Sequence, residues 1–286
     1  MTVLEVIQRS AEFLAKKGVD SPRLQVELLL SSVLLVPRLK LYLDFDRKLT
    51  HSELEAAREL VRRRGHREPL QHILGSTCFC GLEIKVNRHV LVPRPETERL
   101  AELAWQYLCA RDSPGATALD FGTGSGCVAI AVAAKCPDAR LHAADISAEA
   151  LRVARENAVS NNVADKIQFH CGNGFAALPS GVTFDLIVAN PPYIPSAEID
   201  ALAPEVRDYD PRLALDGGPD GLDFYRRLAA EAPGFLRPAG RMMLESGDGQ
   251  TERIGEIVVR HKWVVESVEA DYTGRPRIVI ARPERA

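Results

Sequence analysis

Long uncharged apolar runs are missing from this sequence, and so is an excess of charge of either sign. No apolar stretch of about 18 residues, the length that a membrane-spanning helix requires, occurs in the chain. The first residues (MTVLE) lack the basic start and the apolar segment of a signal peptide, which predicts a soluble, cytoplasmic protein. The formal net charge of −3 gives no general attraction to a polyanion. We therefore expect no membrane partner and no direct binding of nucleic acid.

Closely spaced cysteine pairs of the kind that bind zinc or catalyse redox reactions are also missing. Cys78 and Cys80 are separated by one residue, a spacing typical of neither a zinc site nor a thioredoxin motif. From this spacing we expect no metal site. Because disulfides are rare in reducing compartments, we also expect six reduced, mostly buried thiols. The six residues are Cys78, Cys80, Cys109, Cys127, Cys136 and Cys171.

What is present is the composition of an ordinary globular protein, with 46% hydrophobic and 26% charged residues. The length of 286 residues predicts about two domains. The spacing of Leu4, Ile7, Ala11 and Leu14 is typical of one apolar helix face, and Gly18 follows as a stop signal. We therefore expect the first 75 residues to form a small helical bundle.

Two further helices are expected in this region. Ser21 and Pro22 are suited to the cap and the first residue of a second helix. Thr50 with Glu53 is a capping-box pattern for a third helix that reaches about Arg64. Its end carries a cluster of basic residues between positions 58 and 67, which is either a solvated helix end or a docking surface for an acidic or ribonucleoprotein partner.

The chain changes character between positions 76 and 95. Residues 78–79 and 82–86 predict a β-hairpin with Gly81 at its turn, and the proline-containing stretch 92–98 (VPRPETE) predicts a rigid connector into a helix. Arg94 and Glu96 in this connector are candidates for the entrance of a pocket. We therefore expect a helical domain over 1–75, a hairpin and linker over 76–95, and a second domain over 96–286.

The second domain alternates strands with helices. This pattern predicts an α/β fold with a mostly parallel, seven-stranded sheet covered on both faces, and an antiparallel hairpin at one edge. Helices are expected over 127–135, 147–160, 221–235 and 249–260. Strands are expected over 118–121, 140–144, 167–171, 184–189, 240–245, 263–269 and 277–281.

A glycine-rich loop follows the first of these strands. It reads Gly122-Thr123-Gly124-Ser125-Gly126, and position 127 is Cys, so the dinucleotide fingerprint G-x-G-x-x-G is absent. No Gly-Lys-Ser/Thr follows, which excludes a P-loop. The next strand ends at Asp145, where a carboxylate can accept hydrogen bonds from both ribose hydroxyls or cap a helix. A nucleoside without pyrophosphate fits this pair, and S-adenosylmethionine is such a ligand.

A second candidate site follows the fourth strand, which ends in Asn190-Pro191-Pro192-Tyr193. Proline forces its predecessor out of the helical region, so Asn190 is held extended. The Asn190 side-chain oxygen and the Pro191 carbonyl could accept both hydrogens of an amide or amino group, while Tyr193 packs on its plane. Because the first and fourth strands are expected to be neighbours, a sulfonium methyl group could face that nitrogen.

These two motifs together resemble class I S-adenosylmethionine-dependent amino-methyltransferases, a Rossmann-like fold. Four further stretches, 69–75 (PLQHILG), 92–98 (VPRPETE), 218–222 (GPDGL) and 244–247 (LESG), resemble the HemK-type release factor glutamine methyltransferases over nearly the whole chain. The resemblance implies N5-methylation of the glutamine in the Gly-Gly-Gln motif of class I peptide chain release factors. It also implies that Asn190 to Tyr193 bind this glutamine, and that the cofactor contacts the glycine loop, Asp145 and Asn190.

The chain departs from the family at Asn173 and Gly174, where an acidic residue followed by a bulky one is common. Asn173 could still bond the adenine amino group, and Gly174 offers backbone. Three alternatives remain open: a glutamine methyltransferase of a ribosomal protein, an N6-adenine methyltransferase of nucleic acid, and a non-catalytic interaction protein.

Overall fold

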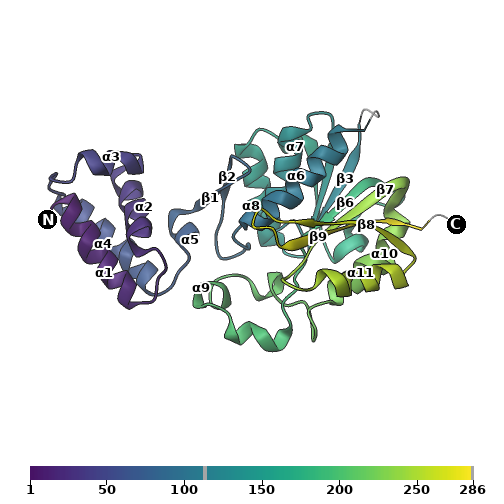
Figure 1. The fold of residues 1–286 in the computed structure, drawn as a ribbon. Helices are drawn as coiled ribbons and strands as arrows, with labels where there is room; N and C mark the ends of the chain where they lie inside the picture. Colours follow the sequence, from purple (N-terminus) through teal and green to yellow (C-terminus); the bar gives the residue numbers. More distant parts are fainter. Residues whose placement is uncertain (112–114, 285–286) are drawn as a thin grey trace. The chain divides into compact units, whose positions relative to one another are not determined.

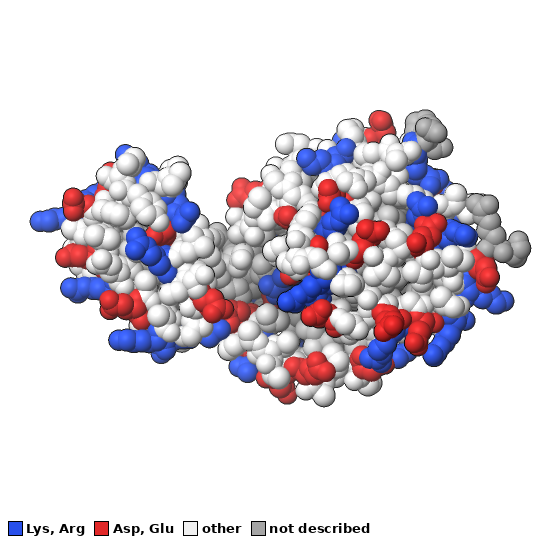
Figure 2. Space-filling view, in the orientation of Figure 1, with Lys and Arg blue, Asp and Glu red and all other residues white. Residues whose placement is uncertain are grey.

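The computed structural model describes residues 1–111 and 115–284, which divide into two compact units. The first comprises Met1–Ser76 with Ala203–Tyr209, and the second comprises Thr77–Leu202 with Asp210–Ala286. No helix among the described residues is long and apolar enough to cross a membrane. On the face drawn in Figure 2, the acidic and basic side chains of each unit are interspersed.

The first unit is a helical bundle around its own apolar core, as expected (Figure 1). Thr50 and Glu53 form the predicted capping box. Ser21 is the N-cap residue and Pro22 the first residue of the second helix, as predicted, although the Ser21 side chain makes no capping bond. The short helix α3 was not anticipated. The helices are α1 (Val3–Lys16), α2 (Pro22–Leu34), α3 (Arg38–Leu43), α4 (His51–Gly65) and α5 (Leu70–Leu74).

A segment from far along the chain completes this unit. It contains the short helix α9 (Pro204–Arg207), and its Glu205 accepts hydrogen bonds from Arg64 at 2.7 Å and Arg67 at 2.6 Å. The Tyr209 hydroxyl donates to the carbonyl of His66 at 2.9 Å. Two more arginines of the basic cluster pair internally, Arg62 with Glu59 and Arg63 with Glu68. These ion pairs favour the structural interpretation of the cluster.

The second unit contains a seven-stranded sheet in the order β5-β4-β3-β6-β7-β9-β8 within residues 115–284. The strands β5, β4, β3, β6 and β7 are parallel, and β9 is antiparallel to both β7 and β8. This confirms the predicted strands, the neighbouring first and fourth strands, and the antiparallel edge hairpin. The strands are β3 (Thr117–Phe121), β4 (Arg140–Asp145), β5 (Ile167–Cys171), β6 (Phe184–Ala189), β7 (Leu236–Glu245), β8 (Trp263–Ala270) and β9 (Pro276–Pro283).

Helices cover both faces of this sheet (Figure 1). Alternate strand residues belong to two separate apolar clusters: Ala118 packs with α6, α7 and α8, while Leu119 packs with α10 and α11. Apolar side chains on both faces explain why the central strands read as continuous apolar runs. The helices are α6 (Pro95–Cys109), α7 (Cys127–Lys135), α8 (Ala148–Ser160), α10 (Asp223–Glu231) and α11 (Thr251–Arg260), and the predicted hairpin is β1 (Ser76–Phe79) with β2 (Leu82–Lys85).

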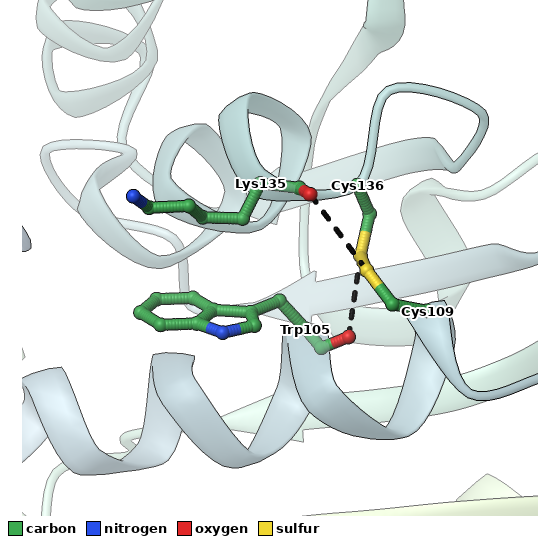
Figure 3. The surroundings of a disulfide bond; sticks show 4 residues. All are labelled: Trp105, Cys109, Lys135 and Cys136. Carbon is green, nitrogen blue, oxygen red and sulfur yellow. Dashed lines mark hydrogen bonds between the residues drawn. A yellow bond between two sulfur atoms is a disulfide. The ribbon is translucent and has the colours of Figure 1, made fainter.

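A disulfide joins Cys109 to Cys136, which corrects the prediction of six reduced thiols (Figure 3). Cys109 ends α6 and Cys136 directly follows α7, and the packing of these helices brings their Cα atoms to 5.8 Å. Residues 27 positions apart give no local signal of this approach. The free thiols are also less buried than expected, because Cys78 and Cys171 are exposed.

Candidate functional site

The predicted site residues gather around one cavity at the carboxyl ends of three adjacent strands, β4, β3 and β6. Ligands of open α/β sheets bind in this position because the loops there diverge. Apolar side chains form much of the wall, including Phe121, Ile146 and Phe224. The predicted residues that line the cavity are Gly122, Gly124, Asp145, Asn173, Gly174, Asn190 and Pro192.

The glycine loop exposes backbone to this cavity at two of its positions. Gly122 and Gly124 have φ values of +75° and +54°, and a Cβ atom on either would meet nothing within 4 Å. Thr123 and Ser125 do not line the cavity; both are buried, and the Thr123 hydroxyl donates to Asp120 at 2.6 Å. Gly126 packs against α8, where its Cβ would lie 3.0 Å from that of Ala154. Gly122 and Gly124 thus face the cavity, whereas the other three residues of the loop pack against the protein.

Asp145 holds the loop from the end of β4. One carboxylate oxygen accepts from the N–H of Gly124 at 2.9 Å, and the other accepts from the N–H of Ser147 at 2.9 Å. Ser147 provides the expected side-chain cap of α8, so the cap does not require Asp145. Burial raises the pKa of Asp145, while bonds from backbone N–H groups lower it. A partly desolvated carboxylate in a cavity wall is well suited to accept the hydroxyls of a ribose.

Asn173 is arranged differently from the expectation. Its side-chain oxygen accepts a hydrogen bond of 2.5 Å from Arg227, and its carbonyl accepts another at 3.0 Å from the same guanidinium. A Cβ on Gly174 would lie 2.6 Å from the Arg227 Nη2 atom, so only glycine leaves room for this arginine. Arg227 therefore already donates to the Asn173 side-chain oxygen, which was expected to accept from an adenine amino group. The NH₂ group of Asn173 is left to make a further polar contact.

Asn190 follows β6 with its amide oriented by a neighbouring helix. Its Nδ2 donates to the hydroxyl of Thr97 on α6 at 3.0 Å. Among the described residues, no hydrogen bond involves its oxygen, which remains free to accept from a ligand in the cavity. Pro191 is buried, and neither it nor Tyr193 lines the cavity. Tyr193 instead packs against the apolar cluster that contains Leu119.

Two glycine-containing loops fix the backbone after Asn190. Ile194 exchanges backbone hydrogen bonds of 3.0 and 2.9 Å with Leu215 and Gly217. A Cβ on Gly217 would lie 2.8 Å from the carbonyl oxygen of Pro192, and one on Gly221 would collide with that of Tyr193. The Tyr193 carbonyl also accepts from Gln250 at 2.9 Å. The stretch 218–222 therefore has a bracing role in the structure.

Comparisons with known proteins agree with this architecture. The "PrmC N-terminal domain" family matches residues 5–75, and the "Methyltransferase small domain" family matches residues 103–205. A release factor glutamine methyltransferase of Geobacter sulfurreducens is 46% identical over 282 residues, covering 98% of this chain and 96% of that protein. A protein of the same name from Chlorobaculum tepidum is 46% identical over 260 residues, covering 88% and 87%.

The chain belongs to the release factor glutamine methyltransferase family. A solved structure of a methyltransferase from Pyrococcus furiosus matches with a TM-score of 0.52 at 22% identity, over 72% of this chain and 90% of that one. This likeness confirms the predicted methyltransferase fold.

The cavity of this methyltransferase fits S-adenosylmethionine, the methyl donor of the family. Gly122 and Gly124 present open backbone, Asp145 supplies a carboxylate, and Phe121 and Ile146 supply apolar wall. The site offers no cluster of cations for a pyrophosphate; Arg227, which lines it, is engaged by Asn173 and by Glu231 at 3.0 Å.

Several residues at this site were not identified from the sequence. Thr97 and Glu245 lie in stretches that carried the family resemblance, which was the available signal, although no role was assigned to them. Arg227 and Gln250 gave no signal, since their partners are 54 and 57 residues away. Arg94 does not line the cavity; it bonds Asp210 at 2.6 Å.

Proposed function

We propose that this protein transfers a methyl group from S-adenosylmethionine to N5 of the glutamine in the Gly-Gly-Gln motif of class I peptide chain release factors. The observation that carries the proposal is the oriented amide of Asn190, whose nitrogen is held by Thr97 and whose oxygen is left for a ligand. The similarity to release factor glutamine methyltransferases over 98% of the chain supports the choice of substrate. Release factors act on ribosomes, so the proposal also places the protein in the cytoplasm.

The chemistry requires alignment more than acid–base catalysis. An amide nitrogen is a poor nucleophile because its lone pair is delocalised. The Asn190 oxygen would accept one of its hydrogens, which helps the lone pair to turn toward the methyl group. Pro191, whose carbonyl was predicted from the sequence as the second acceptor, does not line the cavity. Such positioning can supply roughly 7–11 kcal/mol at best. No strong base is needed beforehand, because the nitrogen becomes acidic as it is alkylated.

In the same proposal, the cofactor and the target occupy neighbouring parts of one cavity. Gly122 and Gly124 with Asp145 would hold the nucleoside, and Asn173 with Gly174 would border the adenine. Asn190 follows β6, which pairs directly with β3, so the target nitrogen would lie beside the glycine loop. Tyr193 packs against the apolar core and so supports the tetrad Asn190-Pro191-Pro192-Tyr193, but it does not line the site.

The test is methyl transfer to a purified release factor. Labelled methyl from S-adenosylmethionine should appear on the wild-type factor and not on a factor whose Gly-Gly-Gln glutamine is replaced by alanine. Mass spectrometry of the tryptic peptide should locate the group on that glutamine. Labelling that survives the replacement, or that appears on a ribosomal protein or on DNA instead, would reject the proposal.

A further inference from the structure

Two buried polar side chains near Asn190 do not line the cavity, and the reaction as described does not use them. Thr97 is 3% exposed and accepts the Asn190 amide hydrogen at 3.0 Å. Glu245, at the end of β7, is 2% exposed, and an interaction with the Thr97 hydroxyl lowers the pKa of its carboxyl. Its Oε2 has no hydrogen-bond partner among the described residues. A buried carboxyl at this position calls for an explanation, since burying it is costly.

The number of protons that Thr97 can donate explains why a carboxylate is buried here. A threonine hydroxyl has a single proton to donate, although its oxygen can also accept. When that proton goes to the Glu245 carboxylate, the Thr97 oxygen can only accept from Asn190. The amide must then turn its NH₂ group to Thr97 and its oxygen to the cavity. If Thr97 donated to Asn190 instead, the amide would present NH₂ to the NH₂ of the target, and two donors would face each other.

We propose that Thr97 and Glu245 are positioning residues that select the productive orientation of the Asn190 amide, through a directed chain of hydrogen bonds from Asn190 to Thr97 and from Thr97 to Glu245. The role rests on the proposed function, because it matters only if Asn190 accepts hydrogens of the target amide. It assigns a purpose to two residues that do not line the cavity.

The chain of bonds works only while Glu245 is ionised. Burial raises the pKa of Glu245 to about 7, while the hydrogen bond from Thr97 lowers it. A protonated Glu245 could donate to Thr97 and so release the Thr97 proton to the Asn190 oxygen. The competent form is the deprotonated one, so kcat should rise with pH through about 7. The charged and titratable groups facing Glu245 are Glu96, which raises its pKa, Arg277 and Arg94, which lower it, and Tyr193, Tyr225 and Cys127.

The test compares Thr97→Val, which keeps the shape of the side chain, with Thr97→Ser, which keeps the hydroxyl and loses the methyl group, in the full-length protein with a release factor as substrate. Valine removes the hydroxyl, and we expect kcat to fall about five- to tenfold, the size of one neutral hydrogen bond. Serine keeps the hydroxyl and should stay within about twofold of wild type by the same reasoning. The dissociation constant of S-adenosylmethionine, measured by calorimetry, should be unchanged in both. Equal kcat values for the two variants would overturn the proposal.

Glu245→Gln provides a second, independent readout. Glutamine can still accept from Thr97 but cannot titrate, so the rise of kcat near pH 7 should disappear. A carbon-13 difference titration between wild type and this variant, without cofactor, should show one carboxyl with a midpoint near 7. A pH profile identical to that of wild type would reject the role of Glu245. If the wild-type protein methylates no release factor, the proposed function fails, whereas normal transfer with indifferent variants refutes the positioning role alone.

Discussion

At the scale of single residues, Asn190 and Asp145 line the same cavity but have different hydrogen-bond partners. The Asn190 nitrogen donates to Thr97, and its oxygen accepts no hydrogen bond among the described residues. Asp145 uses both carboxylate oxygens to hold backbone N–H groups, and it still lines the cavity. Asn190 follows β6 and Asp145 ends β4, and these two strands are separated by β3. Substitution of each should therefore affect a different measured quantity.

Asn190→Ala should lower kcat for release factor methylation by roughly 10²–10³, the usual cost of losing a preorganised polar contact to the reacting group. The dissociation constant of S-adenosylmethionine should change by less than about threefold, because Asn190 borders the cofactor without holding its nucleoside. Single-turnover kinetics and calorimetry measure the two quantities. A loss of cofactor affinity as large as the loss of kcat would show that Asn190 is misplaced in this account.

Asp145→Asn should weaken the binding of S-adenosylmethionine about 10- to 100-fold, the range expected when a charged acceptor of hydrogen bonds is lost. Asparagine keeps the shape of the side chain, so the fold should persist. Calorimetry measures the affinity. Asp165→Asn, an exposed position in a short 3₁₀ helix, serves as the control and should leave it unchanged. An unchanged dissociation constant for Asp145→Asn would exclude the ribose role.

Three of the residues that the sequence identified share one property: each lies at, or directly after, the end of a strand that a local pattern reveals. Gly122, Asp145 and Asn190 end apolar runs, so the strand and the site residue come from the same few positions. Thr97 could not be assigned in this way, because it reaches Asn190 from 93 residues away through the packing of α6. The contact of Asn173 with Arg227 could not be anticipated for the same reason, since Arg227 lies on α10, 54 residues away.

At the scale of elements, strands and helices were predictable where the spacing of apolar residues agreed with the start and stop signals in the sequence. The central strands β3 and β6 are buried over nearly their whole length, and capping signals at Thr50 and Ser147 mark two helices correctly. The short helix α3 has only six residues, too few for a periodic pattern to develop. The disulfide between Cys109 and Cys136 depends on how α6 packs against α7, which is tertiary information.

The loops that brace the tetrad can be tested through Gly221. It has a φ of +76°, and an added Cβ would collide with the Tyr193 carbonyl oxygen. Gly221→Ala should therefore move the backbone behind Asn190 and lower kcat by about tenfold or more, since displacements near 1 Å can cost about 10²-fold. Steady-state kinetics with a release factor measures this.

Gly274→Ala is the matched control for this substitution. Gly274 also has a positive φ, +86°, but a Cβ there would meet nothing within 4 Å. Both alanines carry the same backbone cost of roughly 1–2 kcal/mol, so only the collision distinguishes them. The control should keep the kcat of wild type. Equal kcat losses in the two variants would mean that backbone strain alone, and not the contact with Tyr193, explains the effect.

At the scale of the whole molecule, one segment that follows the tetrad belongs to the helical unit. Residues 203–209 join that unit through Glu205, whose carboxylate binds Arg64 and Arg67. The Arg64 side chain is only 5% exposed, so an unpaired guanidinium there would be costly. The stability of the helical unit should therefore depend on a residue that is more than 125 positions beyond its main segment.

Glu205→Gln should reveal this dependence through pH. Burial raises the pKa of Glu205, but the hydrogen bonds from Arg67 and Arg64 outweigh it and hold the pKa at about 2. A folded-state pKa below the ordinary value of 4.5 means that the stabilisation is complete above that value and is lost as pH falls toward 2. The free energy of unfolding should drop by about 3 kcal/mol at pH 7, and the difference from wild type should shrink to less than about half by pH 3.

Urea unfolding followed by helical circular dichroism at the two pH values measures this difference. Glu59→Gln is the control, because Glu59 pairs with Arg62 on the exposed side of the same cluster. An exposed pair of this kind adds little, so this variant should match wild type at both pH values. A Glu205→Gln deficit that stays constant between pH 7 and pH 3 would show that the loss comes from packing. A deficit that closes with acid identifies the ion pairs as the attachment of residues 203–209 to the helices.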